Sequence, residues 1–166
     1  SVVIGTSAGD NSVIILDSCV LTLGNTGTSS RIGLGGGSLN YSIQTKNCSY
    51  VFGATGQQIT LNAQWESNND VFAATGSVPT TLFGGGRDVN TFVGADMSTV
   101  TGTLAVATAS QPCILNFVQC KLGAGVAVLA ASTGSGHFEA YLYDCASGDT
   151  HYEFAHHNYW GNTTIS

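Results

Sequence analysis

Ile14-Ile15-Leu16-Asp17-Ser18-Cys19-Val20-Leu21 is the stretch that decides the fold, because the chain repeats its pattern. Its order is a run of strand-forming residues, one small polar residue, a cysteine and a second strand-forming run. The same order returns in residues 43–52, 115–122 and 140–146. Repeats with a period of about 20–50 residues are typical of chains that build one core by stacking unit on unit.

The side-chain pattern within the repeat predicts a corner next to the cysteine. Mostly apolar residues stand five and three positions before it: Ile14 and Leu16, Ile43 and Thr45, Leu115 and Phe117, Ala140 and Leu142. After the cysteine the inward position moves to the second residue: Leu21, Tyr50 and Leu122. Because side chains alternate faces along a strand, this change from odd to even offsets requires a corner between two strands.

The repeat predicts an all-β fold, a right-handed parallel β-helix (solenoid) that forms a single domain over residues 1–166. Cys19 and Cys48 are 29 residues apart, Cys120 and Cys145 are 25 apart, and the 72 residues between Cys48 and Cys120 have room for further coils. Residues 59–65 and 91–96 read as degenerate copies in that gap. We therefore expect five to six coils.

The composition agrees with this fold and excludes some partners. The 22 glycines supply turns, and only 8% of the residues are charged, whereas about a quarter is usual. The four Lys and Arg residues are scattered, which argues against nucleic-acid binding. No apolar run is long enough to predict a membrane-spanning helix.

The cysteines predict an inward column of thiols. Five cysteines cannot all pair within one chain, and four of them (Cys19, Cys48, Cys120 and Cys145) share one position in the repeat. Equivalent positions stack in a solenoid, and a free cysteine packs as a small apolar residue. We expect reduced, buried thiols in a protein that folds in a reducing cytoplasm, with a disulfide or a metal site as the alternatives.

The segment from His151 to Trp160 is the best candidate for a special role. On a strand, His151, Glu153 and His157 would share one face and could bind a metal, but the spacing is not that of a helical zinc motif. The favoured interpretation is an aromatic segment that closes the stack or packs on another subunit. We predict no metal and no cofactor, and an interface formed by Tyr152, His156, His157, Tyr159 and Trp160.

Carboxylates are candidate catalytic residues because glycoside hydrolysis uses two of them across a sugar. The candidates are Glu66, Asp70, Asp88 and Asp96, with Trp65 as a sugar platform. Each acid stands in a different local pattern, so we predict no catalytic residues and a protein that is not an enzyme.

The block Leu142-Tyr143-Asp144-Cys145-Ala146-Ser147-Gly148-Asp149-Thr150-His151-Tyr152-Glu153-Phe154 resembles a block in structural proteins of tailed bacteriophages. The resemblance implies a β-helical virion component on the capsid or tail and implies no catalytic residues. In the resembling proteins the chain runs on beyond the point that matches residues 162–166, so we expect further chain at the C-terminus.

Two functions remain open at this point. The first is a capsid decoration (cement) protein or spike module that stabilises the virion, made in the host cytoplasm, forming a homotrimer and contacting the major capsid protein or other virion components. The second is a tailspike or tail-fibre domain that binds host-surface polysaccharide, with or without glycanase activity.

Overall fold

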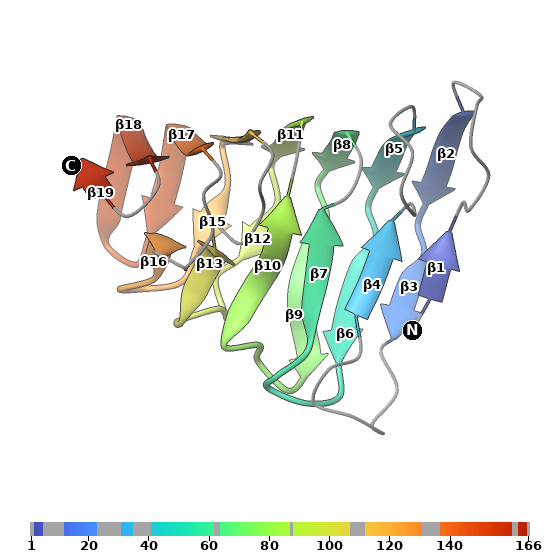
Figure 1. Ribbon diagram of the computed structural model, residues 1–166. Coiled ribbons are helices and arrows are strands. Elements are labelled where there is room, and N and C mark those ends of the chain that lie inside the picture. The colour runs from blue at the N-terminus through green and yellow to red at the C-terminus, as the bar shows by residue number, and fades with distance from the viewer. Residues whose placement is uncertain are drawn as a thin grey trace.

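The strands form one continuous rod (Figure 1). The computed structural model describes residues 2–4, 12–22, 31–34, 41–61, 64–86, 88–106, 112–130, 137–160 and 163–165. All regular elements in these segments are β-strands, as the sequence predicted.

Each turn of the chain passes three faces of the rod. Face 1 consists of β1 (Val2–Ile4), β4 (Arg31–Leu34), β7 (Gln58–Leu61), β10 (Thr81–Gly86), β13 (Thr103–Val106) and β16 (Ala127–Ala130). Face 2 consists of β2 (Ser12–Asp17), β5 (Tyr41–Lys46), β8 (Gln64–Asn68), β11 (Asp88–Val93), β14 (Cys113–Val118) and β17 (His137–Ser147). Face 3 consists of β3 (Val20–Thr22), β6 (Ser49–Phe52), β9 (Val71–Gly76), β12 (Asp96–Met97), β15 (Lys121–Leu122) and the end of β17.

Neighbouring strands within each face pair in parallel, so equivalent residues of successive turns lie one above the other. Ile14 pairs with Ile43, and Leu115 pairs with Ala140. In Figure 1, β7 rises in front, the chain crosses the top through β8, and β9 descends behind while the chain advances to the left. The fold is therefore the predicted right-handed parallel β-solenoid.

The number of turns is slightly smaller than the predicted five to six coils. The solenoid has about four turns. The turns β4–β6, β7–β9, β10–β12 and β13–β15 each have a parallel neighbour on both sides. The strands β1–β3 begin the stack, and β16 and β17 end it, so these outer turns lack one parallel neighbour among the described strands.

The corner between faces 2 and 3 is built from residues with positive φ. They are Ser18, Asn47, Asn69, Gly94, Gln119 and Asp144, with φ between 52° and 63°. This left-handed conformation turns the chain within one residue and shifts the parity of the inward side chains, as the repeat predicted. Backbone hydrogen bonds join successive corners, such as Ser18 N–H to Lys46 O at 2.9 Å and Gln119 N–H to Tyr143 O at 2.8 Å.

The interior of the rod is a continuous stack of apolar side chains. The rings of Tyr50 and Phe72 stack with centroids 4.6 Å apart, and those of Phe92 and Phe117 stack at 5.3 Å. The structure confirms the inward cysteine column: Cys48, Cys120 and Cys145 are buried, Cys19 is half-buried, and all are free thiols. Stacked aromatic pairs contribute stability beyond their buried area.

The structure corrects the position of one degenerate repeat. Residues 59–65 were predicted to form a copy, but β7 lies on face 1 and the copy is residues 64–72. There Asn69 forms the corner and Asp70 takes the cysteine position. The copy at residues 91–96 was placed correctly, with Gly94 at the corner.

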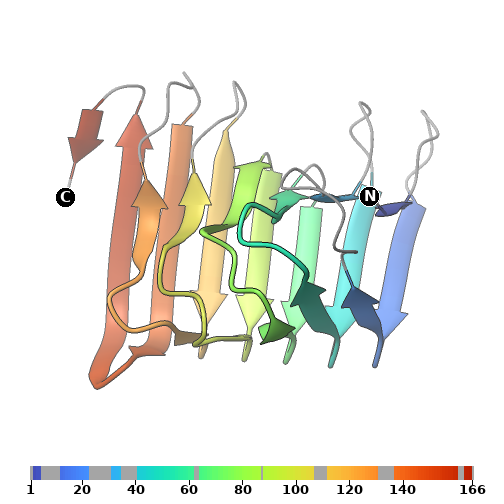
Figure 2. The same cartoon turned by 90° about the horizontal axis from the view of Figure 1, so that it is seen from below.

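The end of the stack is covered by an antiparallel hairpin. The strand β18 (Thr150–Trp160) pairs with β17 along its whole length, from Ser147↔Thr150 to His137↔Trp160, and β19 (Thr163–Ile165) pairs with the end of β18. Figure 2 shows β18 running opposite to the face 2 strands beside β17. Tyr152 and Ala155 of β18 pack against the core.

Candidate functional site

The outward surface of face 2, extended by β18, is the candidate functional surface. The exposed large apolar residues of the described chain are Val13, Ile15, Val20, Val78, Val89, Tyr143 and Phe154. Five of these seven lie on this surface: two on β2, one on β11, one on β17 and one on β18. Exposed apolar side chains gathered on one face mark a contact surface better than scattered ones do.

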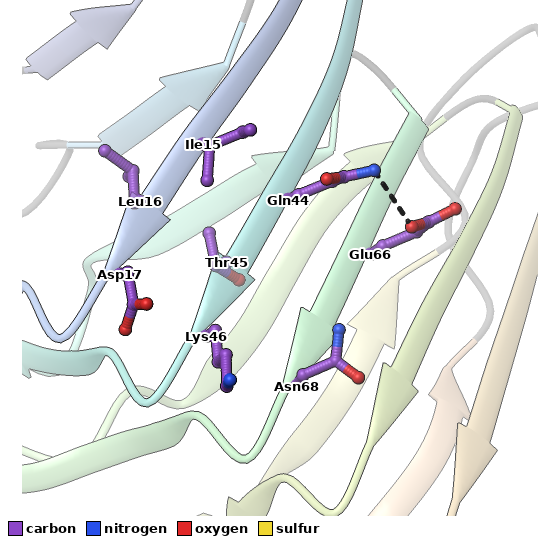
Figure 3. A pocket seen from close by; sticks show the side chains of 8 residues that line it. All are labelled: Ile15, Leu16, Asp17, Gln44, Thr45, Lys46, Glu66 and Asn68. Carbon is purple, nitrogen blue, oxygen red and sulfur yellow. Dashed lines mark hydrogen bonds between the residues drawn. The ribbon is translucent and has the colours of Figure 1, made fainter.

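A shallow pocket of about 210 Å³ lies on face 2 where β2, β5 and β8 run side by side. It is lined by Ile15, Leu16, Asp17, Gln44, Thr45, Lys46, Glu66 and Asn68 (Figure 3). The Gln44 side-chain amide donates a hydrogen bond to Glu66 Oε2 at 3.3 Å, across the gap between β5 and β8. The parallel register produces this arrangement, because Gln44 and Glu66 are paired residues of adjacent strands.

The pocket combines several kinds of polar group with apolar side chains. Asp17 and Glu66 supply carboxylates, Lys46 supplies an ammonium group, and Gln44 supplies an amide, while Ile15 is 69% exposed beside them. Such a mixture can hydrogen-bond a polar ligand and pack against its apolar face. Outward polar side chains also pair farther along face 2, where the Asn116 amide of β14 donates a hydrogen bond to Thr91 Oγ1 of β11 at 3.4 Å.

An aromatic and histidine cluster occupies the C-terminal part of face 2. The rings of Tyr141 and His156 stack with centroids 4.4 Å apart, and the ring centroids of Tyr143 and Phe154 are 5.3 Å apart. These contacts follow from the antiparallel register, which pairs Tyr141 with His156 and Tyr143 with Phe154. The cluster gives β17 and β18 one shared outward surface.

Glu139 anchors this cluster. Its carboxylate accepts a hydrogen bond from the Tyr141 hydroxyl and lies 2.8 Å from His137 Nε2 and 3.9 Å from His156 Nε2. The hydrogen bond to Glu139 raises the pKa of Tyr141, because the carboxylate disfavours a phenolate beside it. The cluster is thus held by directed polar contacts as well as by ring stacking.

The five predicted interface residues pair with β17 residues of two kinds. Three align with core residues of β17: Tyr152 with Cys145, His157 with Ala140 and Tyr159 with Phe138. Two align with outward residues: His156 with Tyr141 and Trp160 with His137. The side chains of Tyr159 and Trp160 lie outside the described part of the structure. Burial lowers the pKa of His157, which is consistent with its inward position.

The residues weighed as a metal site do not come together. His151 Nε2 lies 2.8 Å from Asp144 Oδ1, Glu153 is exposed, and His157 aligns with the core. At the corner formed by Asp144, the inward-facing positions of β17 and β18 change from every second residue in one series to the other. Simple alternation along the sequence therefore predicts the wrong face for residues beyond this corner. Within the described residues, no group of three or more His, Cys, Asp and Glu side chains is placed to hold a metal ion.

The acids weighed for sugar cleavage are also separated. Glu66 is exposed on face 2, Asp70 is buried in the core, and Asp96 begins β12 on face 3, where it lies 3.8 Å from Lys121 Nζ. The side chain of Asp88 lies outside the described residues. Trp65 is fully buried and donates its indole N–H to Thr45 Oγ1 at 2.8 Å, so the interpretation as a sugar platform is wrong.

Sequence reasoning missed Glu139, Tyr141, Tyr143 and Phe154 as members of the surface. The signal was present, because Tyr141 and Tyr143 alternate with the inward residues Ala140 and Leu142 of the same repeat copy. The pairing with β18 carried no such signal, since β18 is antiparallel and lies outside the repeat.

No known protein family, curated protein or solved structure matches this chain. In the segments that the structure describes, no helix has the length and apolar character needed to cross a membrane.

Proposed function

We propose that this chain is a bacteriophage virion structural protein, a capsid decoration (cement) protein or spike module that stabilises the particle without catalysis. The observation that carries the proposal is the gathering of exposed apolar side chains on one side of a rod, from Val13 and Ile15 on β2 to Tyr143 and Phe154 at the other end. The proposed partners are the major capsid protein or another virion component, and further copies of the chain in a homotrimer.

The rod is suited to a mechanical role. Hydrogen bonds between successive turns run along its faces and continue through the corner, for example from Ala146 N–H to Cys120 O at 3.0 Å. The core is packed with stacked rings, and a densely packed interior transmits strain with little deformation. A surface carried by such a scaffold keeps its shape when load is applied to it.

The resemblance to phage structural proteins supports the same proposal. The residues that carry it, 142–154, form the second half of β17, the turn after it and the first half of β18. This hairpin holds Tyr143 and Phe154, whose rings contact each other on the outward surface. The distinctive block therefore coincides with one end of the proposed contact surface.

The test places a charge on this surface. Tyr143→Asp and Ile15→Asp should each lower incorporation into purified particles at least about tenfold, because a desolvated, unpaired carboxylate is costly in an interface. Both side chains are exposed, at 41% and 69%, so the isolated protein should remain folded. Quantitative mass spectrometry of particles measures incorporation, and circular dichroism of the isolated variants checks the fold.

Val78→Asp is the matched control. Val78 is 36% exposed but lies between β9 and β10, away from face 2. It should be incorporated like the wild type. Equal incorporation of all three variants would contradict the proposed surface, and a monomer in light scattering of the complete protein would count against the trimer.

A host-surface polysaccharide is the second candidate partner, as for a tailspike or tail-fibre domain. The pocket between β2, β5 and β8 favours it, because amide, carboxylate and ammonium groups line it together with an exposed apolar side chain (Figure 3). Glu66→Gln and Asn68→Ala should then weaken retention of the protein on host polysaccharide, whereas Gln64→Ala, exposed on the same strand and outside the pocket, should not. Unchanged retention in both pocket variants would exclude this site.

A further inference from the structure

The cysteine column has an arrangement that neither packing nor the proposed function requires. From the first turn to the last, the column at the corner reads Cys19, Cys48, Asp70, Ala95, Cys120 and Cys145. Cysteines therefore form two adjacent pairs, one at each end of the rod, with other residues between them. Backbone hydrogen bonds fix both pairs in register, from Ser49 N–H to Cys19 O and from Ala146 N–H to Cys120 O.

The parallel register places the cysteines of each pair side by side on neighbouring turns. Paired residues of neighbouring strands lie about 4.8 Å apart, and disulfide-bonded cysteines have Cα atoms about 4.4–6.8 Å apart. The later thiol of each pair points toward the turn that holds its partner: Cys48 Sγ donates to Leu16 O at 3.5 Å, and Cys145 Sγ donates to Phe117 O at 3.3 Å.

The two pairs differ in how easily a reagent can reach them. Cys19 is half-buried in the first turn, whereas Cys120 and Cys145 are buried and lie close enough for each thiol to shift the pKa of the other. Among the described strands the first turn also lacks a neighbour on one side, whereas β18 pairs with the last turn, so the turn that holds Cys19 opens more readily.

We propose that Cys19–Cys48 and Cys120–Cys145 are disulfide-forming pairs that link the outer turns of the rod to their neighbours when the folded protein meets an oxidising medium. Cys19–Cys48 forms first, because Cys19 is the more accessible thiol. The inference concerns the folded chain itself and does not depend on the proposed function.

The oxidant is a small disulfide such as oxidised glutathione. The Cys19 thiolate attacks one glutathione sulfur, the glutathione S–S bond breaks, and the first glutathione leaves as a thiolate. The Cys48 thiolate then attacks Cys19 Sγ and expels the second glutathione. The two cysteines lose two electrons, the small disulfide gains them, and the two cysteine protons end on the two glutathione thiols.

Peptide mapping of the folded, full chain after incubation with oxidised glutathione tests the proposal. Unreduced digests should contain peptides linked through Cys19–Cys48 early and through Cys120–Cys145 later. Cys113 is the internal control: it is buried in β14, pairs with Asp88 and Phe138 rather than with a cysteine, and should remain a thiol.

A consequence for stability is measured on the same samples. The linked rod should be cleaved by a protease at its outer turns about tenfold more slowly than the reduced rod, because each link closes a chain loop and suppresses local opening. Cys48→Ser should abolish the N-terminal protection and leave the C-terminal link intact. Links between other cysteines, or thiols that stay reduced while the unfolded chain is oxidised, would overturn the proposal.

Discussion

Asp70 shows how a single residue departs from its repeat without breaking the fold. It occupies the cysteine position of its turn and is fully buried. Ser67 Oγ donates to Oδ2 at 2.7 Å, the Cys48 N–H donates to Oδ1 at 2.7 Å, and the Thr45 hydroxyl also donates to Oδ2. Burial raises the pKa of Asp70, and these hydrogen bonds offset only part of that effect.

The raised pKa predicts the sign of a pH dependence. The unfolded-state pKa of Asp is about 3.9, so the folded state binds the proton more tightly, and stability falls as the pH rises from that value through the folded-state pKa. Asp70→Asn keeps the shape and cannot ionise. We expect its free energy of unfolding, relative to the wild type, to increase between about pH 4 and pH 7, as measured by urea unfolding.

Asp144→Asn is the matched control with the opposite sign. Hydrogen bonds from His151 and Gln119 lower the pKa of Asp144, so its contribution is present above the unfolded-state pKa and is lost as the pH falls through the folded-state pKa. The difference between wild type and Asp144→Asn should therefore shrink toward acid. If Asp70→Asn followed the same trend, Asp70 would be ionised without penalty in the folded rod.

At the scale of the element, the corner between faces 2 and 3 does the most to determine the fold. Each of the four central turns and each of the two outer turns places one residue with positive φ there, and five of these six residues are not glycine. Polar side chains such as Asn and Asp tolerate this conformation because they can hydrogen-bond locally, whereas β-branched residues do not. The Gln119 amide, for example, donates to Asp144 Oδ2 of the next turn at 3.1 Å.

Gln119→Val tests the role of the corner. Valine is strained at a φ of 54°, and the variant should lose about 1–2 kcal/mol of stability in denaturant unfolding. Asn116→Val is the control three residues earlier, since Asn116 is an extended, outward residue of the same β14 region. It should lose less than about 0.5 kcal/mol. Equal losses would mean that the corner conformation is not a constraint.

The fold was predictable from the sequence where the cysteine marks the corner. Residues flanking Cys48 and Cys120 alternated as the structure requires, and their inward positions are buried. The prediction of the repeat copy failed around Asp70, which takes the cysteine position. A buried carboxylate in an apolar column is recognisable only when the residues that donate hydrogen bonds to it are known. The prediction of which β18 side chains share a face also failed. The pairing with β17 and the corner at Asp144 determine which of these side chains face inward, and neither feature is visible in local alternation.

At the scale of the whole molecule, the chain is a rod with two different ends and one distinctive side. Its first turn pairs on one side only among the described strands, whereas β18 covers the last turn. The exposed apolar side chains of β2, β11, β17 and β18 lie along face 2 between these ends. The arrangement suits a protein that contacts other subunits through face 2, with the β17–β18 hairpin at one end of the contact surface.

Oxidative footprinting of the protein, free and in assembled particles, tests this contact surface most directly. Hydroxyl radicals modify exposed aromatic and aliphatic side chains, and mass spectrometry locates the products. In particles we expect oxidation of Tyr143 and Phe154 to fall at least about fivefold, as expected for side chains desolvated in an interface, while Val20 and Val78 keep their reactivity. Unchanged oxidation of Tyr143 and Phe154, with protection elsewhere on the rod, would contradict the account.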